Sequence, residues 1–109
     1  MARDFGLEEL IREHLGQKRG LSEKPMFGGL AWLLNGNLVC GAREDGMLAR
    51  LGKGSDGWAL ATPGITSLVM RGRAMDGWVR ASADAFGDDA VRHRLLSSAL
   101  TFVRTLPPK

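Results

Sequence analysis

Residues 26–41 read MFGGLAWLLNGNLVCG, and this glycine-punctuated apolar stretch decides the fold class. Asn35-Gly36 lies between two apolar runs, and both central positions of a type I′ turn need a positive φ, so the pair predicts a β-hairpin. Asp45-Gly46 repeats the same signal downstream. The two turns predict an antiparallel meander with strands at 26–34, 37–43 and 47–51.

The predicted register gives this meander two apolar faces. A turn at Asn35-Gly36 places Ala31 opposite Cys40 and Trp32 opposite Val39, and residues opposite each other share a face. The Cys40 face is expected to lie beneath helices. The other face is also apolar, and a two-layer domain has helices for only one of them. Either a helix edge or loop covers this second face, or it meets a second copy of the chain in a homodimer. The residues predicted for that dimer interface are Leu30, Trp32, Leu34 and Val39.

The rest of the chain supplies helices and a second group of strands. Near-helical spacing of apolar residues predicts a helix over 4–16 and a long C-terminal helix. A short helix is expected from Ser55 to Ala61, followed by strands at 66–71 and 77–81. The order α-βββ-α-ββ-α predicts an α+β fold with two layers and a largely antiparallel sheet. A length of 109 residues, of which 44% are hydrophobic, is typical of one domain spanning 1–109.

The expected location of the protein is the cytoplasm. No apolar run reaches the roughly 20 residues that a bilayer requires, and acids occupy the N-terminal region where a signal peptide needs an apolar core. Cys40 is the single cysteine, which excludes an intrachain disulfide and agrees with a reducing compartment.

The positive charge raises a nucleic-acid hypothesis. The formal net charge is +3. Some basic residues complement the dipoles of the predicted helices. The basic residues without that explanation are Arg50, Lys53, Arg71, Arg73 and Arg80. Trp78 lies two residues before Arg80 and therefore on the same strand face. Arginines beside an aromatic ring can hold nucleic acid through phosphate contacts and stacking. The plainer interpretation of Arg71, Arg73, Arg80 and Trp78 is a solvated surface.

The motifs for catalysis and cofactor binding are weak. GKGSDG at 52–57 matches G-x-G-x-x-G, but the expected helix is short and the preceding strands turn through hairpins, so a glycine-rich turn is favoured over a dinucleotide site. Cys40 is expected to be buried, and His14 and His93 lack metal-ligand spacing. We therefore expect no enzyme, no cofactor and no metal.

Several motifs together resemble one family. They are PMFGGLAWLLNGNLVCG, LARLG, ATPGI, GRAMDGWVRAS and the closing ALTFVRTLPPK. From about residue 20 onward the chain is similar to the N-terminal domain of the TfoX/Sxy competence-regulator family. The resemblance implies a two-layer α+β domain similar to secretion chaperones, and it favours a homodimer. Full-length members regulate DNA-uptake genes, are thought to act with a DNA-bound cyclic-AMP receptor protein, and carry a second, C-terminal domain.

The function predicted from the sequence is therefore a regulatory or interaction domain that acts by protein-protein contact. A DNA-bound transcription regulator is one candidate partner. The alternative is direct, weak nucleic-acid binding through the strand arginines.

Overall fold

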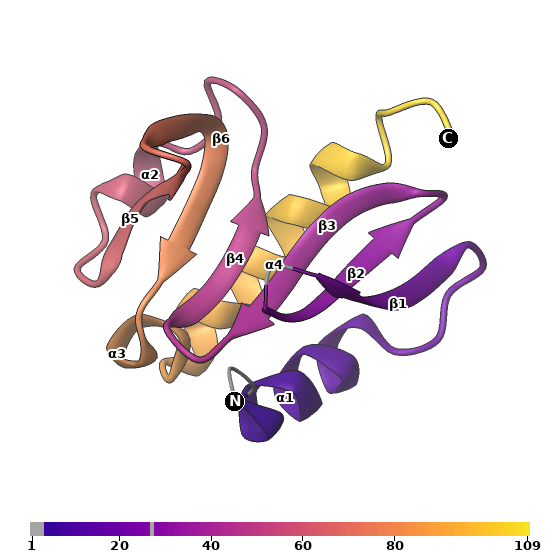
Figure 1. The fold of residues 1–109 in the computed structure, drawn as a ribbon, viewed down its shortest axis with the longest axis horizontal. Coiled ribbons are helices and arrows are strands. Elements are labelled where there is room, and N and C mark those ends of the chain that lie inside the picture. Colours follow the sequence, from indigo (N-terminus) through magenta and orange to yellow (C-terminus); the bar gives the residue numbers. More distant parts are fainter. Residues whose placement is uncertain (1–3, 27) are drawn as a thin grey trace.

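The computed structural model describes residues 4–26 and 28–109. Helices and strands follow one another along the chain as shown in Figure 1. The elements are α1 (Phe5–Leu15), β1 (Leu21–Met26), β2 (Gly29–Leu34), β3 (Asn37–Arg43), β4 (Gly46–Arg50), α2 (Gly57–Leu60), β5 (Ile65–Met70), β6 (Arg73–Ala81), α3 (Ala83–Phe86) and α4 (Asp89–Val103).

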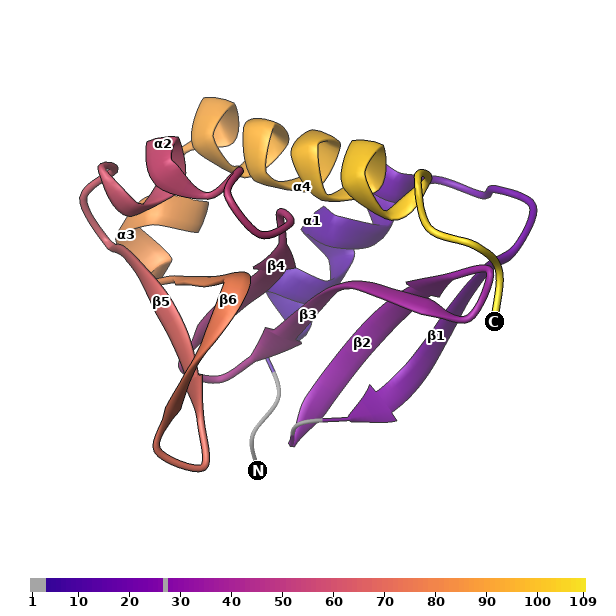
Figure 2. The same ribbon diagram turned by 90° about the horizontal axis from the view of Figure 1, so that it is seen from above.

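The strands form a 6-stranded sheet in the order β1-β2-β3-β4-β6-β5, and every neighbouring pair is antiparallel. Helices α1 and α4 lie on one side of this sheet, while the β1–β2 and β5–β6 pairs diverge on the other side (Figure 2). The prediction of a two-layer α+β fold with an antiparallel sheet is confirmed. We call the side that faces α1 and α4 the helix face and the opposite side the outer face.

The helix face holds one core cluster. Leu7, Ile11 and Leu15 of α1 are buried in it, together with inward residues of α4 such as Leu96 and Val103. Asp4 caps α1 by accepting a hydrogen bond from the Leu7 amide, and Asp88 caps α4 through the Ala90 and Val91 amides. Both long helices thus form where the apolar spacing predicts them.

A β-bulge corrects the predicted register of the first hairpin. Leu33 pairs with Leu38 as expected, but Trp32 pairs with Cys40 rather than Val39, and Ala31 pairs with Gly41. The bulge leaves two residues of β3 opposite one of β2, so Val39 and Cys40 both lie on the helix face. Sequence alternation could not reveal this extra residue because its side chain is apolar like its neighbours.

The bulge places the predicted dimer interface in the core. The four residues concerned belong to the buried cluster beneath the helices, and none exposes more than 6% of its surface. The prediction that they form an uncovered face is therefore wrong, because the register shift turns them to the same side as Cys40, where α1 and α4 cover them. These residues are Leu30, Trp32, Leu34 and Val39.

Strand β1 was not predicted as a separate element. The sequence favoured one strand over 26–34, whereas a hairpin between Met26 and Gly29 separates β1 from β2. The β1 sequence LSEKPM is mostly exposed and contains Pro25, which is tolerated because β1 lies at the sheet edge. Phe27, inside the predicted strand, lies outside the described residues.

The second half of the sheet also differs from the prediction. The expected loop RGRAMDG is a tight turn at Arg71-Gly72, with φ of 53° and 77°, after which β6 starts at once. The helix expected over Ser55–Ala61 is reduced to α2, and α3 follows β6 as a further short helix. Among the described residues no helix is long and apolar enough to cross a membrane.

Candidate functional site

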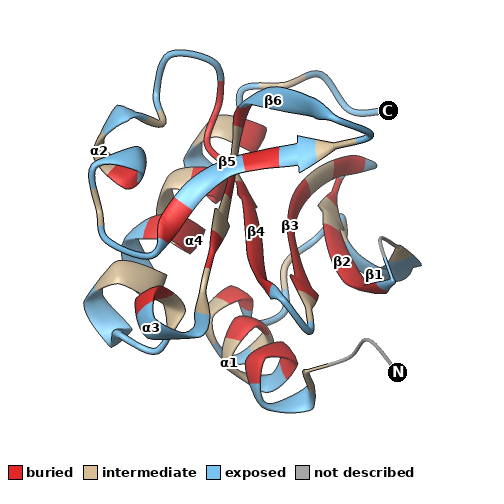
Figure 3. Ribbon diagram, turned by 60° about the vertical axis from the view of Figure 1, so that its left-hand side comes forward, coloured by how far each residue is buried: buried red, intermediate tan, exposed pale blue. Residues whose placement is uncertain are grey.

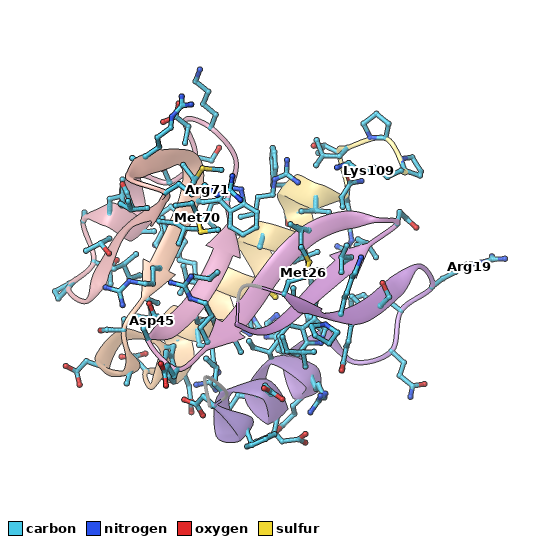
Figure 4. The ribbon with its side chains drawn as sticks, viewed as in Figure 1. Arg19, Met26, Asp45, Met70, Arg71 and Lys109 are labelled. Atoms are coloured by element: carbon cyan, nitrogen blue, oxygen red, sulfur yellow. The ribbon has the colours of Figure 1, made fainter. Side chains whose placement is uncertain are left out.

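A hollow on the outer face is the candidate binding site. It has a volume of about 280 Å³ and draws its lining from four strands and the C-terminal tail. Its lining residues are Leu38, Arg50, Leu68, Met70, Met75, Trp78 and Lys109. We call it the outer hollow. Figure 4 looks onto this face, with Met70 and Arg71 on the β5–β6 hairpin and Lys109 on the other side.

Arg50 of the outer hollow lies beside two aromatic rings, Trp78 in the hollow and Phe102 on α4. Arg50 and Trp78 are cross-strand partners on β4 and β6. The Arg50 guanidinium carbon lies 5.9 Å from the centroid of the Trp78 ring and 5.5 Å from that of Phe102 on α4. Both distances are within the range of cation–π attraction, so the cation is held beside apolar surface.

Backbone contacts at Gly77 fix this pair in place. The amides of Leu51 and Gly52 both donate to the Gly77 carbonyl, at 2.7 and 3.2 Å. Gly77 has a φ of 81°, and a Cβ there would lie 2.6 Å from the Gly52 carbonyl carbon. Only glycine allows this close approach, which ties the end of β4 to the residue just before Trp78.

The C-terminal tail forms another wall of the hollow. The Lys109 amide donates to the Asn35 carbonyl at 2.8 Å, and the Asn37 side chain donates to the Pro107 carbonyl at 2.9 Å. The tail is thereby fastened to the β2–β3 turn, which brings Lys109 to the rim.

The structure separates the residues predicted for nucleic-acid contact. Trp78 lies in the outer hollow, while Arg71 within the β5–β6 turn and Arg73 just after it line an adjoining depression with Ala74 and Asp76. Met70 and Met75 line both surfaces, so the two are continuous. Arg80 lies farther along the outer face, where its guanidinium donates to the Asp45 carbonyl at 2.6 Å.

Most of the apolar residues that line the outer hollow were not predicted from the sequence. Leu68 and Met70 are two residues apart, and Met75 follows on the other arm of the same hairpin. Such spacing by two could have marked one strand face. No local signal indicated that Leu38 and Lys109, far away in the sequence, complete the hollow.

A histidine pair lies between α1 and α4. The rings of His14 and His93 meet edge to face with centroids 4.7 Å apart, and the His14 Nε2 lies 3.3 Å from the Ser97 hydroxyl. Burial, followed by the charges of His93, Lys18 and Arg92, lowers the pKa of His14. No group of three or more His, Cys, Asp or Glu side chains in the described part of the chain is placed to hold a metal.

Cys40 does not join the histidines. Its side chain belongs to the core cluster, and burial raises the pKa of its thiol well above the ordinary value. A thiol in this state is a poor nucleophile. The Cys40 side chain thus packs as a small apolar group.

The glycine-rich loop lies outside any parallel unit. Gly52 and Gly54 precede the short helix α2, and every strand pair in the sheet is antiparallel. A larger depression beside this loop, of about 440 Å³, is lined by hydroxyl and aromatic side chains of the loop region and α4. Two of its hydroxyls, on Thr101 and Thr105, already donate to backbone carbonyls of α4 residues. This depression also has a cation over an aromatic ring, since the Arg94 guanidinium carbon lies 3.9 Å from the Trp58 centroid. The outer hollow is preferred as the candidate site because four strands and the C-terminal tail converge there, with two methionines in its lining.

Comparison of the chain with protein-family models, with curated proteins and with solved structures found no significant match.

Proposed function

We propose that this chain is a regulatory interaction domain that binds a protein partner through the outer hollow and acts by contact rather than by catalysis. The observation that carries the proposal is the combination of apolar and cationic groups around that hollow. Leucine, methionine and tryptophan form its walls, with Arg50 beside Trp78. Methionines adapt their shape to a partner, and a cation beside apolar surface suits an acidic, aliphatic protein segment.

The distribution of charge supports an acidic partner. Arg71 and Arg73 stand at the exposed hairpin turn next to the hollow, and Asp76 is the one acid lining that depression. The resemblance to the N-terminal domain of TfoX-type regulators agrees with a role in regulation through protein contact. A DNA-bound transcription regulator remains the partner class that this resemblance suggests.

The test is selection of peptides from a phage-displayed library of random dodecapeptides. We expect enrichment of sequences that combine aspartate or glutamate with aliphatic residues. In fluorescence anisotropy, Arg50→Glu should weaken their binding by tenfold or more, about 1.4 kcal/mol. The matched control is Arg19→Glu, which changes net charge equally at a position remote from the hollow (Figure 4).

Two results would contradict the proposal. One is the absence of enriched peptides. The other is an equal loss of binding in Arg50→Glu and Arg19→Glu, because peptide binding would then depend on the net charge of the protein and not on the outer hollow.

Direct nucleic-acid binding is the second candidate. It is favoured by one observation, the exposure of Arg71 and Arg73 in the depression that adjoins the hollow lined by Trp78. In this case duplex or single-stranded DNA should bind with an affinity that falls steeply with salt. Arg71→Ala and Arg73→Ala should each weaken binding, whereas Arg80→Ala should have less effect because Arg80 is engaged with Asp45.

A further inference from the structure

The two edges of the sheet differ in how they are protected. β1 carries Glu23, Lys24 and Pro25, and charges and proline on an edge strand discourage pairing with another chain. β5 reads ITSLVM, with neither a charge nor a proline. Val69 within it is 57% exposed. The β5 edge therefore lacks the charges and the proline that protect β1, and its one irregularity is a register shift between Ser67 and Val69 in the pairing with β6.

Backbone hydrogen bonds show which groups of β5 point away from β6. The Ser82 amide donates to the Gly64 carbonyl at 2.8 Å, which makes these two residues a hydrogen-bonded pair. Hydrogen-bonded and non-hydrogen-bonded pairs alternate along an antiparallel ladder. Ser67, paired with Val79 three positions along, is thus in a non-hydrogen-bonded pair, and its amide and carbonyl face outward.

The other end of β5 gives the same result for Val69. Met70 and Arg73 flank a two-residue turn and form its closing hydrogen-bonded pair. Val69, opposite Ala74, is then in a non-hydrogen-bonded pair with its amide and carbonyl outward. Ser67 and Val69 are two residues apart, which is the spacing at which an added strand forms its hydrogen bonds.

The side chains of β5 link this edge to the outer hollow. Leu68 and Met70 line the hollow, so the outer face of β5 is one of its walls. In Figure 3, β5 is buried at two separate points, which correspond to Ile65 in the core cluster and Leu68 in the outer hollow. A strand added beside β5 would place every second side chain next to Leu68 and Met70.

We propose that the β5 edge accepts an extended, acidic segment of a partner protein as an additional strand. The inference rests on the proposed function and names its mode of recognition. Main-chain hydrogen bonds to Ser67 and Val69 would give affinity, and the hollow would select aliphatic side chains. Arg71 and Arg73 at the adjoining turn favour acidic residues through charge complementarity.

The test measures how tightly two Ser67 variants bind the peptides selected in the test of the proposed function. Ser67→Pro removes the outward amide while leaving the β6 ladder intact, because that amide makes no bond to β6. Ser67→Ala keeps the amide and removes only the hydroxyl. We expect Ser67→Pro to weaken peptide binding by about tenfold or more, and Ser67→Ala to bind like the wild type. Undiminished binding to a folded Ser67→Pro variant would overturn the strand addition, while the loss in Arg50→Glu would still uphold the proposed function.

Amide hydrogen exchange gives a second measurement that needs no variant. In the free protein the amides of Ser67 and Val69 should exchange fast, and those of Thr66 and Met70 slowly. Added peptide should protect Ser67 and Val69. Protection confined to other residues would overturn the inference. So would concentration-dependent protection of Ser67 and Val69 without peptide, accompanied by dimers in sedimentation, because the occupant would then be a second copy of the chain.

Discussion

Replacing Gly77 by alanine tests the packing that supports the outer hollow. The φ of 81° disfavours any residue with a Cβ, at a cost of about 1–2 kcal/mol. The new Cβ would also lie 2.6 Å from both the Gly52 carbonyl carbon and the Lys53 nitrogen. These are backbone atoms that cannot rotate away, so we add about 1–3 kcal/mol for overpacking. The expected loss of unfolding free energy is about 2–5 kcal/mol.

Gly72→Ala is the matched control for this prediction. Gly72 has nearly the same φ, 77°, but a Cβ there meets nothing within 4 Å. It should lose only the backbone contribution of about 1–2 kcal/mol. Equilibrium urea unfolding of both variants, followed by circular dichroism, measures the difference. If Gly77→Ala is no less stable than Gly72→Ala, the close approach to Gly52 is not what requires glycine at this position.

Three further outcomes are expected. Cys40 should react with a thiol reagent only as the protein unfolds, so labelling should follow the denaturation curve rather than proceed in native buffer. Because the folded-state pKa of His14 lies below its ordinary 6.5, the unfolded chain binds more protons below that pH. Stability should be full above pH 6.5 and fall on acidification, and His14→Gln should flatten the dependence of the melting temperature on pH. Trp32→Phe keeps an aromatic ring but loses the 3.2 Å indole hydrogen bond to the Glu23 carboxylate and leaves space in the core, where Trp32 is 1% exposed, so it should cost about 2–4 kcal/mol in denaturant unfolding.

The sequence predicted best where a local pattern determines the structure. The helices α1 and α4 form where the spacing predicts them because each buries one side that is apolar, apart from Glu8 in α1. The turn forms at Asn35-Gly36 because asparagine and glycine accept the positive φ that both central positions require. The φ values are 53° and 83°. Prediction failed at β1, whose exposed position in the sheet gives it no apolar alternation.

In the candidate site too, the residues with a local sequence pattern could be predicted and those brought together by long-range pairing could not. Trp78, Arg71 and Arg73 could be singled out from the sequence as a basic, aromatic group. Their relation to one another depends on the turn at Gly72 and the close approach at Gly77, which involve residues from β4. The apolar lining from β3 and the C-terminal tail comes together only through long-range pairing of the chain. No local sequence pattern predicts such long-range contacts.

The bulge at Val39 has a consequence for how the length of this chain can vary. Removing one residue from a strand usually transfers every residue beyond it to the opposite face of the sheet. Val39 is the additional residue of the Trp32–Cys40 pair, so its deletion would restore regular pairing while Trp32, Cys40 and Ala42 keep their faces. A deletion at Ala49, in the regular part of β4, would instead turn Arg50 toward the core. A homologous chain that lacks the bulge residue of β3 is therefore compatible with this same sheet, whereas one that lacks a residue from the regularly paired part of β4 would need its register to shift.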